Sequence, residues 1–383
     1  MTSTDRPRAL IIGAGIGGLA AGIALERAGY RVTLFERAGS LRESGFGLLL
    51  APNAVRALRM LGVADRVIEQ SEVGREGELR AANGRVLKRV SMDAIRRTTG
   101  EDSVCALRQV LHGALLDALS DADVRTAARV VGFEQSANGV EVELEGGERV
   151  PGALLVAADG LHSIVRANLH RDLVHPSGLV AYRGVGRNTT WTNTGCQYFG
   201  IGMEAGVARA GQDSVYWYLS VKRAAAHTEL EPKSAALVIG HAFDAALVSL
   251  IEATEPADVH RDDLFDRAPL RAWGEGRITL LGDAAHPMLP HAGQGAAQAL
   301  EDAVVLGRCL TSAADLQAGL RRYEALRIPR TTRIVAIARR NAQVSRLENQ
   351  WVCGLRNWLL AHGPAAMLEK QMISIARVDL EAV

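Results

Sequence analysis

A glycine-rich turn between an apolar run and a helix constrains the fold of this chain more than any other feature. Gly13-Ala-Gly-Ile-Gly-Gly18 follows Ala9-Leu-Ile-Ile12, a run typical of a buried parallel strand. The glycines allow a tight turn, and a helix from there to about Ala28 would present free N–H groups to a pyrophosphate. After Gly29 a second strand is expected over Arg31–Phe35. The pattern predicts a βαβ unit that binds a dinucleotide.

An acidic residue at the end of this unit supports the same interpretation. Glu36 stands eighteen residues after Gly18, close to the ~20 at which a carboxylate meets ribose hydroxyls in such folds. The unit alone leaves FAD and NAD equally open. A glycine-rich turn without a ligand is the alternative interpretation.

A second glycine-rich segment lies near the other end of the chain. Arg277–Leu281 is expected to be a buried strand, which puts Asp283 at its carboxyl end, where open α/β sheets contact ligands. After Pro287 and Pro290, Gly293-Gln-Gly-Ala296 is expected to begin a helix. Its positive dipole end would stabilise an anionic reduced flavin, and Asp283 could bind a ribitol chain. A single long cofactor bound by both segments fits FAD better than NAD. The alternative interpretation of the second segment is a plain loop before a core helix.

Three motifs occur in one order along the chain: Gly13–Gly18 with Glu36-Arg37, Asp159-Gly160 within Leu154–Arg166, and Gly282-Asp283 leading into Pro290–Asp302. Together they resemble the fingerprints of the single-component (group A) FAD-dependent aromatic monooxygenases. The likeness is greatest to the salicylate, hydroxynicotinate and alkylquinolone hydroxylase branch, and it covers the chain from about residue 8 to about residue 345.

The resemblance implies noncovalently bound FAD, NADH or NADPH as a transient co-substrate, and O2. It implies that Asp159 serves both FAD and the nicotinamide cofactor and that Arg108 contacts the cofactor. In the family, NAD(P)H reduces FAD, O2 adds at the flavin C4a carbon, and the resulting hydroperoxide transfers oxygen to an electron-rich ring. The expected cofactor-binding residues are Gly13, Gly15, Gly18, Glu36, Arg37, Arg108, Asp159, Gly282, Asp283, Pro290, Gly293, Gly295 and Ala296.

Catalytic candidates come from a strand pattern and from two family matches. Asp213–Lys222 alternates Tyr216 and Tyr218 with apolar residues, so one face of a strand is polar. Those tyrosines either line a substrate cavity or face water. Arg183 matches a family arginine that approaches the flavin or a substrate anion, with a plain salt bridge as the alternative. His291 could move a proton or only hold its loop.

We therefore expect an α/β fold like that of para-hydroxybenzoate hydroxylase, in which a Rossmann-like FAD-binding domain is interleaved with a β-sheet substrate domain and followed by a helical C-terminus. The FAD-binding domain is expected at 1–75, 100–171 and 263–335, the substrate domain at 76–99 and 172–262, and the helical segment at 336–383. Short alternating runs predict a hairpin over 76–90 and a meander over 130–150.

Composition limits the possible partners. The formal net charge is +1 over 383 residues, which gives no reason to expect nucleic acid or an acidic membrane. The four cysteines are scattered and include no C-x-x-C pair, so we expect neither a metal site nor disulfides. This pattern favours a reducing cytoplasm as the location of the protein. No secretory signal or membrane-spanning run is expected; the apolar tail 358–368 allows at most transient membrane contact. The expected partner is a small-molecule substrate, and the protein is expected to be a monomer or a homodimer.

Other enzyme classes fit less well. A hydrolase would need paired carboxylates or a G-x-S-x-G motif, and Glu301-Asp302 are adjacent on a helix, so we expect them to diverge and share no site. The flavin halogenase signature Trp-x-Trp-x-Ile-Pro is missing from the sequence. Epoxidation or Baeyer–Villiger oxidation of a nonaromatic substrate, a flavin oxidase or dehydrogenase, and a protein that only binds nucleotide stay open.

Overall fold

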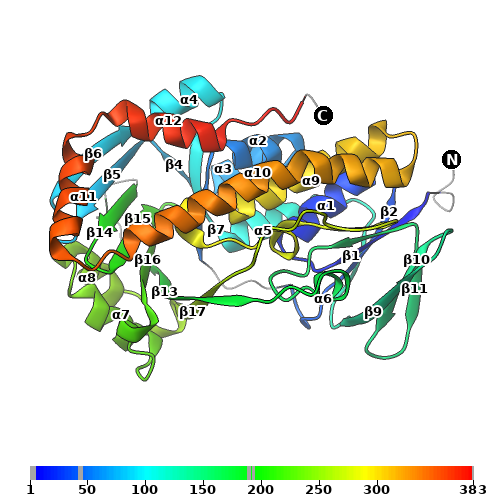
Figure 1. The fold of residues 1–383 in the computed structure, drawn as a ribbon, viewed down its shortest axis with the longest axis horizontal. Helices are drawn as coiled ribbons and strands as arrows, with labels where there is room; N and C mark the ends of the chain where they lie inside the picture. Colours follow the sequence, from blue (N-terminus) through cyan, green and yellow to red (C-terminus); the bar gives the residue numbers. More distant parts are fainter. Residues whose placement is uncertain (1–5, 42–45, 188–190, 192–194, 382–383) are drawn as a thin grey trace.

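The computed structural model describes residues 6–41, 46–187, 191 and 195–381, and its architecture is shown in Figure 1. Segments far apart in the sequence form a five-stranded parallel sheet in the order β18-β12-β1-β2-β8. Its strands are β1 (Arg8–Ile12), β2 (Arg31–Phe35), β8 (Asp123–Arg125), β12 (Leu154–Ala157) and β18 (Ile278–Leu280). Every side chain of β12 and β18 is buried, as expected for parallel strands covered on both faces.

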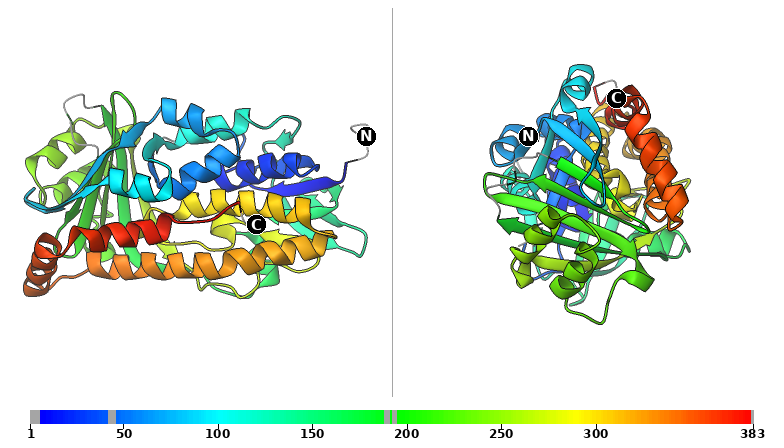
Figure 2. Two further views of the ribbon diagram at one scale, coloured as in Figure 1. Left: turned by 90° about the horizontal axis from the view of Figure 1, so that it is seen from above. Right: turned by 90° about the vertical axis from the view of Figure 1, so that its left-hand side faces the viewer.

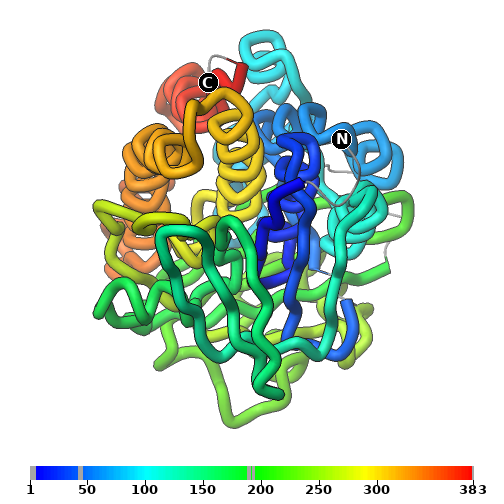
Figure 3. The backbone as a smooth tube through the Cα atoms, turned by 90° about the vertical axis from the view of Figure 1, so that its right-hand side faces the viewer, coloured from blue at the N-terminus to red at the C-terminus, as the bar shows by residue number. Residues whose placement is uncertain are grey.

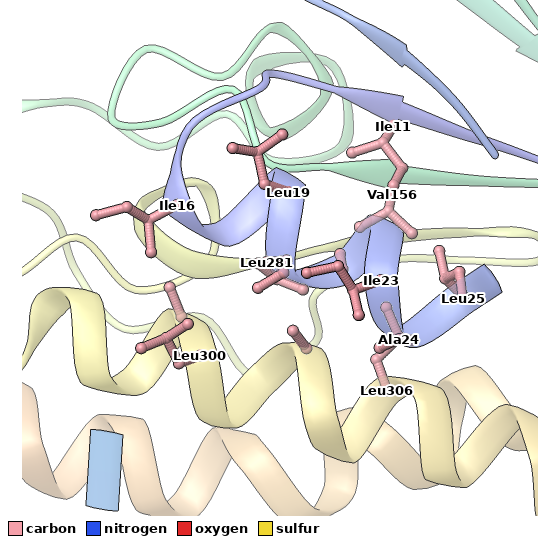
Figure 4. Close-up of a cluster of buried hydrophobic side chains, with 14 of the residues drawn as sticks. Ile11, Ile16, Leu19, Ile23, Ala24, Leu25, Val156, Leu281, Leu300 and Leu306 are labelled. Carbon is pink, nitrogen blue, oxygen red and sulfur yellow. The ribbon is translucent and has the colours of Figure 1, made fainter. Parts of the chain in front are cut away.

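Helix α1 (Ile16–Arg27) runs from the glycine turn and packs along α9 (Gly295–Ser312). Figure 4 shows their contact, where Ile16, Ile23 and Ala24 of α1 meet Leu300 and Leu306 of α9. A Cβ on Gly307 would lie 2.9 Å from Cβ of Ala24, so glycine is what lets the two helices approach so closely. This packing fixes both glycine-rich segments in one rigid unit.

A seven-stranded mixed sheet, in the order β17-β13-β16-β15-β14-β5-β6, forms the other half of the molecule. Helices α7 (Pro232–Gly240) and α8 (Ala245–Glu252) cover one of its faces, and the buried core between them includes Trp217, Tyr182 and Leu219. The strands are β5 (Glu76–Ala81), β6 (Val86–Ser91), β13 (His175–Arg187), β14 (Gly195–Phe199), β15 (Met203–Arg209), β16 (Ser214–Lys222) and β17 (Val259–Asp266).

Two smaller sheets complete the β structure. The meander β9 (Val130–Gln135), β10 (Val140–Leu144) and β11 (Arg149–Gly152) lies at the end of the molecule that faces the viewer in Figure 3, next to β1 and α6 (Ile164–Leu169). The strands β3 (Gly47–Leu50), β7 (Ser103–Leu107) and β4 (Glu72–Gly74) form a short antiparallel sheet in the order β3-β7-β4. The predicted hairpin and meander are confirmed.

The long helix α10 (Leu316–Ser345) runs along most of the molecule, and α11 (Gln350–His362) and α12 (Ala365–Ala376) follow it at the end of the mixed sheet (Figures 1 and 2). The remaining helices are α2 (Pro52–Met60), α3 (Ala64–Glu69), α4 (Met92–Thr99) and α5 (Arg108–Asp117). Within the described ranges, none of the helices has the length and apolar character needed to cross a membrane.

The expected α/β architecture with a helical C-terminus is confirmed. Two expected domain borders fall inside continuous elements: 262/263 lies in β17 and 335/336 lies in α10. The interleaved division of the chain therefore stays a prediction.

Candidate active site

The glycine turn before α1 is shaped by two close approaches and one open position. Gly13 has φ +98°, and a Cβ there would lie 2.4 Å from the carbonyl oxygen of Ala158. A Cβ on Gly18 would lie 1.9 Å from the Gly13 carbonyl oxygen, whereas one on Gly15 would meet nothing within 4 Å. Space beside the first N–H groups of α1 is where a diphosphate binds in this type of unit.

Two charged residues at the end of β2 lie beside this turn. The Glu36 carboxylate accepts hydrogen bonds from the backbone N–H groups of Ala14, at 3.0 Å, and Ala38, at 2.9 Å. Arg37 is close enough to Asp159 to lower its pKa electrostatically. The structure thus brings together the residues that the sequence placed at the adenosine end.

Asp159 stands at the carboxyl end of β12 with one oxygen unused. Its Oδ2 accepts from the Ile164 N–H at 2.9 Å, while Oδ1 is buried and has no hydrogen-bond partner among the described residues. Burial raises the pKa of this carboxyl, and hydrogen bonds with Ser163 and Ile164 and the charge of Arg37 offset part of that rise. Buried acceptors in folded proteins are normally satisfied, so Oδ1 is suited to a ligand hydroxyl.

Asp283 lies in a short 3-10 turn after β18, where three features converge. Its surface is solvent-accessible, yet protein surrounds it so closely that desolvation raises its pKa; His286 and Arg108 counteract this electrostatically. A Cβ on Gly295, at the start of α9, would be 3.9 Å from Asp283 Oδ1. An accessible carboxylate, a guanidinium and a helix N-terminus at one point suit a polyol joined to a diphosphate.

The structure contradicts the expectation that Glu301 and Asp302 share no site. Both are fully buried in α9 and converge on Arg327 of α10, through contacts of 2.5 Å from Glu301 Oε2 to Nη1 and 2.6 Å from Asp302 Oδ1 to Nε. Adjacent carboxylates diverge around a helix axis, but the wide guanidinium fork spans both. Burial alone would raise the pKa of Asp302, and the charges of His286 and Arg327 more than offset this and hold it at about 2.

Asn53, at the start of α2, was not recognised from the sequence. Its amide donates to Gln294 Oε1 at 2.9 Å and to Glu301 Oε1 at 2.6 Å, which links β3 and α2 to the N-terminus of α9. The polar residues Gln294, Gln298 and Glu301 recur at helical spacing on the buried side of α9. That polar stripe within an apolar helix is the signal that could have revealed the network.

On the mixed sheet, Tyr216 and Tyr218 share the face opposite the α7–α8 core. Their ring centroids lie 6.2 Å apart, and both rings are half-buried. A Cβ on Gly47 would lie 2.3 Å from Tyr216 Cγ, so the backbone of β3 covers this ring. A Cβ on Gly206 would lie 2.1 Å from Tyr218 Cε1. Burial raises the pKa of Tyr216 to about 12 and that of Tyr218 well above its ordinary value, so both hydroxyls stay protonated.

Arg183, on the neighbouring strand β13, forms a salt bridge. Its Nη1 lies 2.9 Å from Asp262 Oδ2, and its guanidinium lies 5.6 Å from the centroid of Phe46. The same side chain acts electrostatically on Tyr216.

His291 reaches this polar face from the loop that precedes α9. Its side chain is 1% exposed, and Nε2 lies 3.7 Å from Glu204 Oε1 and 3.4 Å from Ser220 Oγ. Burial lowers the pKa of His291 to about 4. Glu204 was not recognised from the sequence, because an acid in an otherwise apolar strand gives no local sign of its partners.

The chain matches the family model described as "FAD binding domain" over residues 6–338. It belongs to the FAD-dependent aromatic monooxygenase family. The chain is 36% identical to the aurachin C monooxygenase/isomerase of Stigmatella aurantiaca, covering 97% of this chain and 95% of that protein. It is 33% identical to 3-hydroxybenzoate 6-hydroxylase 1 of Aquipseudomonas alcaligenes, covering 86% of this chain and 87% of that protein. The structure of Klebsiella pneumoniae HpxO complexed with FAD and uric acid superimposes with a TM-score of 0.89 at 26% identity, covering 97% of this chain and 96% of that one.

The residues of this flavoprotein monooxygenase fit FAD. The unused Oδ1 of Asp159 and the open space at Gly15 suit the adenosine and diphosphate portion. Asp283 and the N-terminus of α9 suit the ribitol and flavin portion. The family and the FAD-complexed neighbour bear out FAD as the cofactor, while the role of each residue stays a prediction.

Proposed function

We propose that this enzyme uses NAD(P)H and O2 to hydroxylate a small aromatic or heteroaromatic substrate at a site between the FAD-binding residues and the tyrosine face of β16. The observation that carries this proposal is that β3 contacts both the tyrosine face of β16 and the loop that precedes α9. Gly47 lies against Tyr216, and two residues further Leu49 is 55% exposed, with its Cδ2 4.0 Å from the position of a Cβ on Gly293. An exposed leucine between a cofactor loop and a tyrosine face is suited to an apolar ring.

Each part of the chain has a separate task in this proposal. FAD, reduced by NAD(P)H, supplies the oxygen-activating chemistry. Asp159, Arg108 and Asp283 would hold the cofactor, and the 287–293 loop and β3 would exclude water from the reacting ring. The Tyr216 or Tyr218 hydroxyl, protonated at neutral pH because burial raises its pKa, would orient the ring by a hydrogen bond.

The relatives support an aromatic substrate. Relatives of this chain are hydroxylases or monooxygenases of 3-hydroxybenzoate, 3-amino-4-hydroxybenzoate and urate, each a small ring compound. We extend to this chain the class of reaction and not any one of these substrates. A small-molecule partner and a monomeric or homodimeric state are part of the proposal. So is a cytoplasmic location, which fits four cysteines that are all free thiols.

The test combines cofactor consumption with product analysis. The FAD-loaded protein is mixed with NADH or NADPH and a panel of phenols and hydroxy-heteroarenes, and NAD(P)H oxidation is followed with and without each compound. Under isotopically labelled O2, the expected product carries one labelled oxygen atom on the ring. Flavin reduction by the substrate itself, without NAD(P)H, would instead identify an oxidase or dehydrogenase, and labelled epoxide or lactone would identify the nonaromatic alternatives.

A further inference from the structure

A buried acid lies behind His291 on the tyrosine face. Glu204 of β15 accepts hydrogen bonds at Oε2 from Ser345 of α10, at 2.5 Å, and from Gln197 of β14, at 3.3 Å. Its Oε1 faces Nε2 of His291 at 3.7 Å, and Arg356 of α11 acts on it electrostatically from further away. The Glu204 side chain is 3% exposed. The second carboxylate oxygen therefore has His291 as its neighbour.

His291 is contacted through one nitrogen only. Nε2 faces Glu204 Oε1 and Ser220 Oγ, whereas Nδ1 is buried and has no hydrogen-bond partner in the described part of the chain. A neutral imidazole has one N–H and one lone pair. With the N–H directed to the oxygens at Nε2, the lone pair is at Nδ1. An unused buried acceptor beside the tyrosine face requires a partner, which a ligand can provide.

Burial acts on the two groups in opposite directions. It lowers the pKa of His291 to about 4, with Arg346 and Arg183 adding to the decrease. It raises the pKa of Glu204 to about 7, offset in part by Ser345, Gln197 and Arg356. Tyr218, which also faces Glu204, keeps its proton. A proton that reaches this pair therefore rests on the carboxyl group and leaves the imidazole neutral.

We propose, on the basis of the hydroxylase function above, that His291 Nδ1 accepts the proton of an uncharged substrate ring and that Glu204 receives a proton from His291 Nε2. The O–H or N–H bond of the ring breaks and an N–H bond forms at Nδ1. The Nε2–H bond breaks and an O–H bond forms at Glu204 Oε1. One negative charge moves from Glu204 to the ring, and no electrons are exchanged. His291 is the catalytic residue, and Glu204 acts through it as a positioning residue that also stores the proton.

This relay specifies a class of substrate. An anionic ring is more electron-rich than its neutral form and reacts faster with an electrophilic oxygen. Among the ion pairs of the described residues, Glu204 has no arginine or lysine partner, so its carboxylate disfavours a second carboxylate nearby. The site therefore selects uncharged phenols, hydroxy-heteroarenes or lactams over benzoates.

The first experiment tests the pair without any substrate. The FAD-loaded protein is labelled with nitrogen-15 histidine, and the His291 signals are identified by their loss in His291→Gln. The expected spectrum is a neutral imidazole protonated at Nε2 throughout the neutral pH range. A ring that titrates near the ordinary histidine pKa, or one protonated at Nδ1, would overturn the pair whatever the enzyme catalyses.

The second experiment tests the step itself, with 4-hydroxyquinoline and 3-hydroxybenzoate as probes. We expect 4-hydroxyquinoline to stimulate NAD(P)H oxidation and hydroxylation at least about tenfold more than 3-hydroxybenzoate. Because Glu204 must be ionised to accept the proton, kcat should fall as the pH drops below about 7. Glu204→Gln should remove this dependence and lower kcat by about 100-fold with little change in KM. Preference for the benzoate, or an unchanged pH dependence, would overturn the relay.

Three controls separate a chemical role from a structural one. Ser345→Ala removes a hydrogen bond that lowers the Glu204 pKa, so the fall in kcat should move to higher pH. 4-Nitrophenol, assayed at a pH well above its own pKa so that it is ionised before binding, should lose less activity in Glu204→Gln than 4-hydroxyquinoline does. Glu78→Gln replaces a buried glutamate on the opposite face of the same sheet and should keep the wild-type pH dependence. If neither probe stimulates NAD(P)H oxidation, the proposed function and substrate class fail, while the histidine spectrum still decides the pair.

Discussion

The backbone N–H of Gly282 donates a 3.0 Å hydrogen bond to the carboxylate of Asp302, twenty residues further along the chain. The same oxygen, Oδ2, lies 2.6 Å from His286 Nε2, and Oδ1 contacts Arg327. Asp302 of α9 therefore binds residues on both sides of Asp283. Through Arg327 it also joins their turn to α10. The position of the proposed cofactor-binding carboxylate therefore depends on a buried ion network on α9 and α10.

We predict that Asp302→Asn destabilises the protein by about 3–5 kcal/mol at neutral pH, because the buried Arg327 then keeps only Glu301 as a counter-charge, which it shares with Arg330. The folded-state pKa is depressed from 3.8 to about 2, so this stability is present above about pH 4 and is lost as the pH falls toward 2. Urea unfolding of wild type and variant across that range measures both effects. Asp315→Asn, at the exposed N-cap of α10, is the matched control and should change stability little. Equal stabilities of wild type and Asp302→Asn would mean that the network is not stabilising.

Asp283→Ala should lose FAD. The carboxylate stands at the end of β18 beside the α9 N-terminus, and its removal leaves the ribitol hydroxyls without an acceptor. We expect FAD affinity to fall at least about tenfold, measured by flavin absorbance after gel filtration. Glu275→Ala, an exposed acid just before the same strand, should retain FAD. Full occupancy in Asp283→Ala would refute the assignment.

Asp159→Ala should weaken both FAD binding and flavin reduction by NAD(P)H. The unused Oδ1 is expected to bind a cofactor hydroxyl, and Oδ2 holds the Ile164 N–H at the start of α6. Stopped-flow reduction of the FAD that remains bound separates the two effects. Asn349→Ala removes the N-cap of α11, which is not in contact with Asp159, with an expected loss of about 1 kcal/mol, and should reduce at the wild-type rate. If Asp159→Ala alters stability alone, the residue is structural.

The sequence predicted the parts of the fold that local patterns specify. The β1–α1–β2 unit begins and ends near the expected residues because glycine conformation and strand hydrophobicity are local properties. Alternation in β16 correctly assigned Tyr216 and Tyr218 to one face and Trp217 to the other, since side chains of a strand point alternately to opposite faces.

Contacts between distant segments could not be predicted in this way. Asn53 and Glu301 are 248 residues apart, and nothing near either residue in the sequence indicates the hydrogen bond between them. The pair of Glu204 and His291 similarly depends on how the loop before α9 lies against β15. The expectation that Glu301 and Asp302 share no site was wrong because it considered only their own helix and not the arginine of α10.

Tyr216→Phe and Tyr218→Phe should separate oxygen consumption from hydroxylation. If one hydroxyl orients the substrate ring, its removal leaves the ring misplaced while reduced flavin still reacts with O2. The ratio of hydroxylated product to NAD(P)H consumed should fall at least about threefold in one variant, with FAD content unchanged. Tyr198→Phe changes a buried tyrosine on the opposite face and serves as the control. Wild-type coupling in both test variants would place the orienting group elsewhere.

Gly47→Ala tests whether β3 and the tyrosine face form one site. The new methyl group would lie 2.3 Å from Cγ and 2.4 Å from Cβ of Tyr216, so the ring must move away from β3. Overpacking of this kind costs about 1–3 kcal/mol. Because Leu49 lies two residues further along β3, on the same face, and contacts the Gly293 loop, we also expect weaker substrate binding and a lower yield of product per NAD(P)H. Gly113→Ala, in α5, places its methyl group where nothing lies within 4 Å and should stabilise the protein slightly without changing coupling. If Gly47→Ala lowers stability but leaves substrate affinity and coupling intact, the contact between β3 and Tyr216 serves packing alone and the substrate binds away from it.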